Sequence, residues 1–144
     1  MRHRKSDKKL GRKSPHRRAM FNNLVTALLT YGRIETTEAK AKMLRAHADK
    51  AITWGTSVHA LVAKGDGATP VEKAKILHAR RQAKLVVKTP DALSRLFSEI
   101  GPHFATRKGG YTRVIMTRVR KGDAAPMAFV ELVGLNGQPE AASA

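Results

Sequence analysis

The feature that most constrains this chain is a dense run of positive charge at its N-terminus. Nine of the first eighteen residues are Lys or Arg, and only one is acidic. Like charges at this density repel one another, and the only large apolar side chains before residue 14 are Met1 and Leu10, so the segment has little to bury. Such a segment becomes ordered when a polyanion neutralises it, which is typical of a nucleic-acid-binding arm. We therefore expect residues 1–13 to form a basic arm.

The whole chain has the same bias. Its 144 residues contain 28 Lys and Arg against 11 Asp and Glu, which gives a formal net charge of +17. This length is enough for one domain with a modest core. A charge this large destabilises a compact chain by self-repulsion unless a partner supplies negative charge. Phosphate backbone is the first candidate; an anionic membrane is the second, but no apolar run reaches the roughly 18 residues of a membrane span, so we expect no membrane insertion.

The sequence does not contain the residues or motifs that several kinds of chemistry require. The absence of cysteine excludes disulfides, thiolate catalysis and cysteine zinc sites. No apolar segment follows the basic start as in a secretory signal, and Gly11 and Pro15 interrupt any transit-peptide helix. The six histidines show no i, i+4 metal-binding pair, and the glycine motifs of nucleotide-binding loops and nucleophile elbows are missing. We therefore expect no enzyme activity, no cofactor, no metal and no small-molecule substrate.

Local signals predict a helix and a strand at the start of the domain. Ser14 is expected as an N-cap with Pro15 at the first helical position, and Gly32 is expected to end the helix. A β-prone run over 33–36 follows. The next helix is then expected to start after Thr37 and to close at Trp54 and Gly55.

Further helices and a hairpin are predicted after residue 57. The sequence from Thr69 to Glu72 is a capping box that starts a helix running to about Val87. Another helix is expected from Thr89, stopped by Gly101 and Pro102. The period then changes to that of strands, over 111–119 and 127–133.

This order predicts an α+β fold of two layers. A helix, a strand, several helices and a two-stranded hairpin are most simply arranged as a small mixed sheet covered by helices. The expected organisation is a basic arm over 1–13, a single domain over 14–133 with a flexible insertion at about 56–70, and a disordered tail over 134–144.

Three basic features beyond the arm have two interpretations each. Arg17 and Arg18 lie at a helix start, where the macrodipole disfavours cations, so they indicate either an external anion or a solvated turn. Gly109 and Gly110 are either a plain turn or a close approach of backbone to phosphate, favoured by the basic and aromatic flanks. The helix over 70–87 has a basic face that is either solvated or lies along a nucleic-acid backbone.

Five motifs resemble the family of bacterial large-subunit ribosomal protein seventeen, in order and from residue 1 to about 133. The resemblance implies an α+β structural protein on large-subunit ribosomal RNA, near the rim of the peptide exit region and beside other ribosomal proteins, hence cytoplasmic. Residues 56–70 look longer than the family's minimal form and the tail after Val133 is extra, so neither inherits a role. The motifs are M-R-H-R-K (1–5), S-P-H-R-R-A-M-F-N-N-L (14–24), I-E-T-T-E-A-K-A-K (34–42), G-P-H-F-A-T-R-K-G-G-Y-T-R (101–113) and G-D-A-A-P-M-A-F-V-E-L-V (122–133).

The basic pattern and the resemblance together give a set of candidate RNA-binding residues in the arm, at two helix starts and around the glycine pair. They are Arg2, His3, Arg4, Lys5, Lys8, Lys9, Arg12, Lys13, His16, Arg17, Arg18, Asn22, Asn23, Lys40, Lys42, Arg45, Arg107, Lys108, Gly109, Gly110, Tyr111 and Arg113.

Two other functions compete with this reading. A DNA-binding architectural protein would show the same charge and salt sensitivity, but DNA readers usually concentrate contacts on one recognition helix or ribbon. Here the charge is spread over an arm, helix starts and a hairpin, which suits a folded RNA met from several sides. An RNA-modifying enzyme would need a cofactor loop or an acid–base cluster, and the sequence offers neither.

Overall fold

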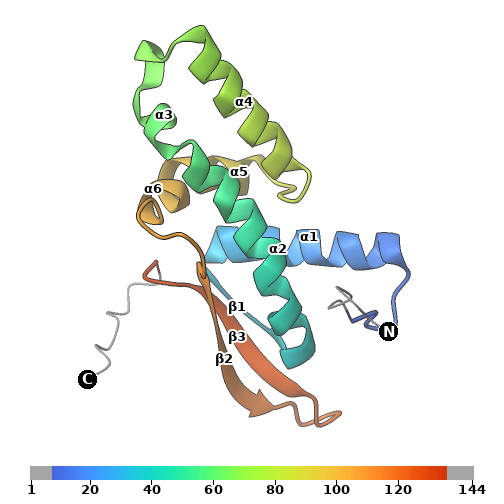
Figure 1. Ribbon diagram of the computed structural model, residues 1–144. Helices are drawn as coiled ribbons and strands as arrows, with labels where there is room; N and C mark the ends of the chain where they lie inside the picture. Colours follow the sequence, from blue (N-terminus) through green and yellow to red (C-terminus); the bar gives the residue numbers. More distant parts are fainter. Residues whose placement is uncertain (1–7, 136–144) are drawn as a thin grey trace, which may run out of the picture.

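The computed structural model describes residues 8–135 of the 144-residue chain. Its elements follow the expected order, so the α+β class is confirmed. The long helix α2 runs diagonally through the molecule, with a pair of helices at one end and the β-hairpin at the other (Figure 1). The elements are α1 (Ser14–Tyr31), β1 (Arg33–Thr37), α2 (Glu38–Ser57), α3 (His59–Ala63), the 3-10 helix η1 (Gly65–Gly67), α4 (Pro70–Lys84), α5 (Pro90–Arg95), the π-helical turn η2 (Leu96–Ile100), α6 (Gly101–His103), β2 (Thr112–Val119) and β3 (Pro126–Leu132).

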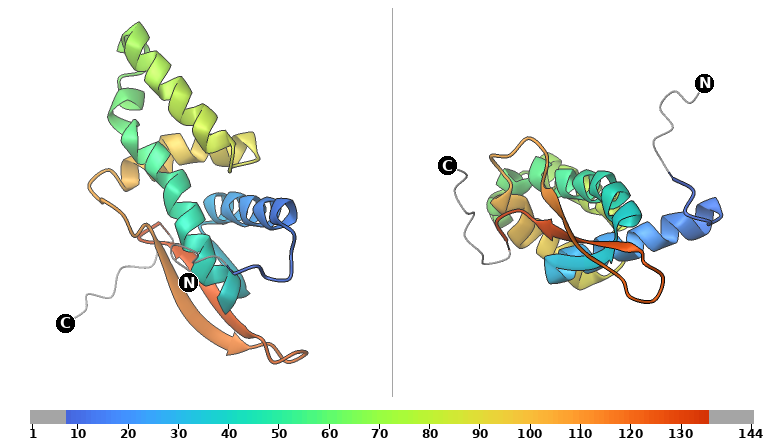
Figure 2. Two further views of the ribbon diagram at one scale, coloured as in Figure 1. Left: turned by 45° about the vertical axis from the view of Figure 1, so that its right-hand side comes forward. Right: turned by 90° about the horizontal axis from the view of Figure 1, so that it is seen from below.

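The sheet contains three strands in the order β1-β3-β2. Both strand pairs are antiparallel, so the described sheet is antiparallel rather than mixed as expected. The long helical connection between β1 and β3 would allow either direction; the observed one lets the Leu132 N–H donate to the Gly32 carbonyl at 2.9 Å and extend the pairing. Helices cover one face of the sheet, which gives the two layers visible in the turned views (Figure 2).

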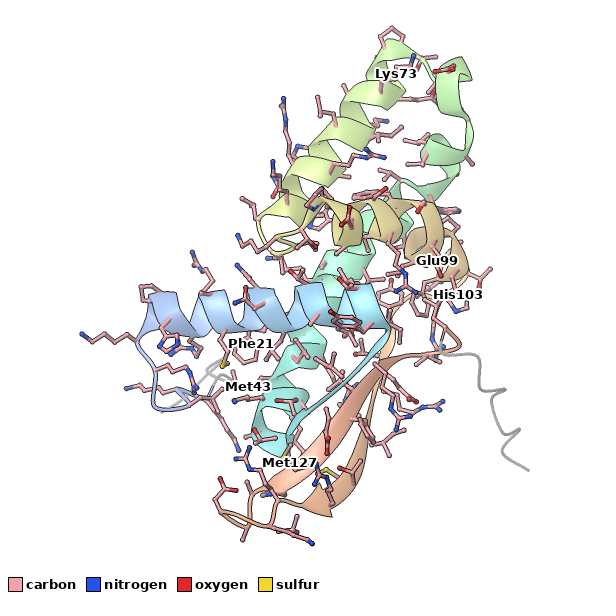
Figure 3. All side chains as sticks on the ribbon, turned by 180° about the vertical axis from the view of Figure 1, so that it is seen from behind. Phe21, Met43, Lys73, Glu99, His103 and Met127 are labelled. Carbon is pink, nitrogen blue, oxygen red and sulfur yellow. The ribbon has the colours of Figure 1, made fainter. Side chains whose placement is uncertain are left out.

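The core forms where α1 crosses α2. Phe21 and Leu28 of α1 and Leu44 and Ile52 of α2 are at most 1% exposed, and in Figure 3 the labelled Phe21 and Met43 lie at this crossing. The predicted end of α1 is confirmed, because Gly32 has φ 77° and its N–H donates to the Leu28 carbonyl at 2.8 Å.

The predicted start of α1 is wrong by one residue. Ser14 is already helical, Lys13 is the N-cap, and no side chain caps the helix. Pro15 therefore occupies the second helical position, where its missing N–H is still one that the helix leaves unpaired.

Two glycines predicted to stop helices instead let two helices meet. α2 continues past Gly55 to Ser57, and the π-helical turn η2 leads directly into α6, whose first residue is Gly101. A Cβ on Gly101 would lie 2.8 Å from the carbonyl oxygen of Gly55, and one on Gly55 would lie 3.0 Å from the carbonyl oxygen of Leu96. Backbone contact at this distance requires glycine, so packing between helices overrides the stop signal of each residue.

The segment expected as a flexible insertion at about 56–70 contains α3 and η1. The capping box that follows is confirmed: the Glu72 N–H donates to Thr69 Oγ1 at 3.3 Å, and the Thr69 N–H donates to Glu72 Oε2 at 2.8 Å. Lys64 also forms an ion pair with Glu72. α4 ends at Lys84, three residues earlier than predicted, and Val87 is buried in the core beyond it.

The two chain ends are described in part. Residues 1–7 and 136–144 lie outside the described residues, so the expected disorder of the arm and tail is not addressed there. Leu135, the last described residue, packs partly against the core. The division into an arm, a domain with an insertion, and a tail stays a prediction.

We predict that Gly101→Ala destabilises the protein. The new methyl group would overlap the backbone of α2, and overpacking of this kind lowers the free energy of unfolding by about 1–3 kcal/mol. Urea unfolding followed by circular dichroism measures it. Gly67→Ala is the matched control, because a Cβ there meets nothing within 4 Å. Equal stability of the two variants would contradict this prediction and show that α2 and α6 can move apart to accommodate a methyl group.

We predict that the contribution of Glu72 to stability depends on pH. The Lys64 ammonium and the Thr69 N–H hold the pKa of the Glu72 carboxyl at about 2, below its usual value of 4.5. A lowered folded-state pKa stabilises the fold above pH 4.5, and this stabilisation is lost as the pH falls toward 2. Urea unfolding of the native protein and of Glu72→Gln should therefore differ at pH 7 and converge near pH 2. A difference that persists at pH 2 would contradict this account.

Candidate nucleic-acid interface

The second half of the basic arm is folded against the start of α1. Leu10 has φ 54° and packs partly against the core, and Gly11 has φ 63°, so the chain reverses in two consecutive left-handed residues. Arg12 Nη1 donates to the Leu10 carbonyl at 2.9 Å, and Arg17 Nη1 donates to the Arg12 carbonyl at 3.2 Å. These bonds fix where the arm leaves the domain.

At the start of α1, cationic side chains add to the partial positive charge of the helix N-terminus. Its first turn contains no acidic residue and no side-chain cap. Lys13, His16 and Arg18 are exposed there, and Arg17 is half-buried. Since the helix dipole already places partial positive charge at this end, the site is electrostatically suited to an anion.

A groove of about 520 Å³ adjoins this helix start. Arg18 and Asn23 line it from α1, and Lys88 lines it from the segment after α4. Asn22 also lines it, but Asn22 is only 7% exposed and its Nδ2 donates to the Leu85 carbonyl at 3.3 Å. Of the two predicted asparagines, Asn23 is therefore presented to solvent and Asn22 joins α1 to the end of α4.

The predicted cations at the start of α2 differ in their surroundings. Lys40 is half-buried and Arg45 is exposed. Lys42 forms an i, i+4 ion pair with Glu38, which neutralises part of its charge.

The segment around the glycine pair presents cations and buries its aromatic ring. Arg107 and Lys108 are exposed. Gly110 has φ 62°, which is the left-handed conformation expected if the glycine pair forms a turn. Tyr111 is only 4% exposed, and its ring packs on Phe104 with centroids 5.1 Å apart. Tyr111 remains a candidate RNA-binding residue, but its ring is part of the core in this structure. Arg113 is exposed, and its Nη1 lies 3.8 Å from Oε1 of Glu131.

Ion pairs separate two groups of cations. Between residues 8 and 135, six acidic residues take part in the ion pairs, and their partners are cations of the sheet, its hairpin loop, the start of α2, the segment after α3, and α5. The exposed cations of the arm, of the α1 start, of α4 and of the 107–108 turn form no such pair with an acidic residue in that range. Their charge is thus available to an external anion.

Sequence reasoning left some cations out of its candidate set. The exposed cations of α4 form the basic face that the sequence predicts, but they are not among the candidate residues. Lys88 carried no local signal, because only the packing of α1 against the end of α4 brings it beside Arg18. The additional exposed cations for which no ion pair with an acidic residue is seen between residues 8 and 135 are Lys50, Lys73, Lys75, Arg80, Arg81, Lys84, Lys88 and Lys121.

The other titratable groups show structural roles. Burial raises the pKa of the Asp49 carboxyl, while the Thr112 hydroxyl that donates to it at 3.2 Å and the charge of Arg45 oppose this. Asp49 thereby ties α2 to β2. Within residues 8–135, no cluster of His, Asp and Glu is arranged to hold a metal, and no helix combines the length and apolar character of a membrane span.

Four predicted residues, Arg2, His3, Arg4 and Lys5, lie outside the described residues. Lys8 and Lys9 are exposed at the first described positions. The structure thus brings Lys88 beside the start of α1, against which residues 10–12 of the arm also fold. The predicted residues at the start of α2 and in the 107–113 segment lie on other elements.

Comparison with known proteins identifies the family. The family model described as Ribosomal protein L17 matches residues 20–133. "Large ribosomal subunit protein bL17" of Desulfotalea psychrophila is 50% identical over 143 residues, which cover 99% of this chain and 98% of that protein. Proteins of the same name from Desulforapulum autotrophicum and Pelobacter propionicus are 47% and 43% identical, over 92% and 100% of this chain and 97% and 100% of theirs. The chain belongs to the ribosomal protein L17 family.

Proposed function

We propose that this protein is a structural component of the large ribosomal subunit that binds large-subunit ribosomal RNA. Its family consists of ribosomal proteins rather than enzymes, and the relatives that match nearly its whole length are named as large-subunit proteins. The proposal places it on the cytoplasmic ribosome, near the rim of the peptide exit region, with neighbouring large-subunit proteins as further partners.

The separation of paired from unpaired cations carries the RNA-binding part of this proposal. A folded protein with a net charge of +17 needs counter-charge, and its own acids serve mainly the sheet and the nearby helix ends. Within residues 8–135, most of the cations that remain lie on the arm, α1, α4 and the 107–108 turn. Phosphates are the anions that such a distribution would meet on a folded RNA.

Sedimentation tests the ribosomal assignment directly. A cell lysate is separated on a sucrose gradient, and the protein should travel with the large subunit and with whole ribosomes. Cross-linking of purified large subunits followed by mass spectrometry tests the location, since cross-links should join this protein to those that surround the exit. Recovery at the top of the gradient would reject the assignment, and cross-links only to distant proteins would reject the location.

We predict that unpaired cations determine the salt dependence of RNA binding. The logarithm of the binding constant should fall with the logarithm of salt concentration by roughly 0.7 to 0.9 for each phosphate neutralised. Replacing Arg18 and Lys108 together by Gln should lower this slope by about that amount per residue. The matched control replaces Arg118 and Arg120, which are held by Glu35 and Asp123; its slope should change less. Fluorescence anisotropy with labelled ribosomal RNA measures both, and equal slopes would contradict the distinction.

We predict that the arm is needed for RNA affinity and not for folding. Deleting residues 2–9 removes five cations and keeps Leu10, which packs against the core. Circular dichroism should show unchanged helix content, while affinity for ribosomal RNA should fall. Deleting residues 136–144, which contain no Lys or Arg, is the control of similar length. If the arm deletion still binds RNA and joins large subunits as the intact chain does, the basic surfaces of the helices are the main anchor instead.

A further inference from the structure

An apolar groove lies between the end of α2 and the start of α4, beside the basic face of α4. Its volume is about 420 Å³. Trp54 and Val58 line it from the α2 side, and Val71, Ala74 and His78 line it from α4. Val71 is 66% exposed, and Trp54, the only tryptophan of the chain, is half-buried. Large apolar side chains gathered at a surface mark a contact site.

The surroundings of this groove are positively charged. Lys75 is one of its lining residues, and no acidic residue of the described chain lines it. Lys73 is exposed and lies near the outer end of α4 in Figure 3. The one acidic residue of α4, Glu72, is occupied by Lys64 and by the capping box. A ligand that meets this rim must therefore bring its own negative charge.

We propose that the groove receives an unstacked nucleobase of the RNA, which stacks on Trp54 while its phosphates meet Lys75 and Lys73. The ring of Trp54 is held by an edge contact with His78, with centroids 5.8 Å apart. Unpaired RNA bases bind in this manner to aromatic side chains flanked by cations. The proposal rests on the proposed RNA-binding function and adds to it a recognition of single-stranded RNA by the α2–α4 end of the molecule.

Charge favours a base over a segment of another protein as the occupant. An apolar side chain from a protein partner would fill the groove equally well, but it would leave the cations of α4 uncompensated unless its flanks were acidic. An RNA nucleotide supplies the apolar ring and the phosphate in one unit.

Trp54 fluorescence provides the test, because the chain has no other tryptophan. The full-length protein at low salt is titrated with two probes, a ten-nucleotide oligoadenylate and a blunt RNA duplex, and excited where tyrosine does not absorb. Anisotropy of labelled probe measures binding in the same samples. We expect the oligoadenylate to quench Trp54 at saturation and the duplex, whose bases are stacked inside, to quench it much less.

Two variants test the position of the base. Val71→Glu places a carboxylate in the groove without touching the core, and it should lower the affinity for oligoadenylate about tenfold and remove the quenching, the factor expected for loss of one base–aromatic stack. Leu85→Glu makes the same change at a side chain that is 65% exposed at the end of the same helix and outside the groove. This control should keep the quenching.

The outcomes separate the two proposals. Oligoadenylate that binds without quenching Trp54, or equal quenching by the duplex, overturns the nucleobase site and leaves RNA binding intact. Equal loss in Val71→Glu and Leu85→Glu overturns it as well, because general charge would then explain the effect. If neither probe binds at low salt, the proposed function fails and the nucleobase site fails with it.

Discussion

Burial of the inner side of α2 is the constraint on which the other elements depend. α2 contacts α1, α4, α6 and all three strands, so the helical layer and the sheet meet on this one helix. Ala41, Leu44, Ala48, Ala51 and Ile52, all at most 1% exposed, supply the contact. Alanine alternating with larger residues lets neighbouring elements approach closely, and at Gly55 the approach reaches the backbone. Most helical stability comes from such packing rather than from propensity.

The charge of the surface follows from the small number of acidic residues in the chain, 11 against 28 Lys and Arg. Its acidic side chains brace the sheet and helix ends, as in the pair between Arg118 of β2 and Glu35 of β1, which spans the central strand. Arg33 both approaches Glu131 and lies over the Phe129 ring at 3.7 Å. Within residues 8–135, the cations of the arm and α4 form no ion pair with an acidic side chain, although Arg12 donates to the Leu10 carbonyl and Arg80 lies 5.4 Å from the centre of the Phe97 ring. The same residue types thus serve stability on one part of the molecule and remain available for phosphate on another.

Local chemistry made much of the fold predictable. Gly32 and the Thr69–Glu72 capping box end and begin helices through groups within one turn of the chain, and the sequence contains all of them. Gly55 and Gly101 carry the same local signal as Gly32, yet they lie inside a helical path, because their role depends on a helix distant in sequence. The antiparallel pairing of β1 with β3 also could not be predicted, because no residue near β1 in the sequence determines it.

The candidate site divides in the same way. The positions of positive charge could be read directly, but the burial of Tyr111 and the bond from Asn22 to Leu85 arise only from tertiary packing. Lys88 reaches the α1 groove for the same reason. The pairing of Arg118 with Glu35 joins residues 83 positions apart, so which cations are neutralised could not be inferred from spacing.

The connection between α2 and α4 has an evolutionary consequence. α3 and η1 contain no fully buried residue, and Leu61 and Val62 only flank the core. Chain can therefore be gained or lost between Val58 and Ala68 without repacking the helix crossing beneath it. A ribosomal protein built in this way can change its outline to suit the ribosome of a given lineage while the framework that presents its basic surface stays the same.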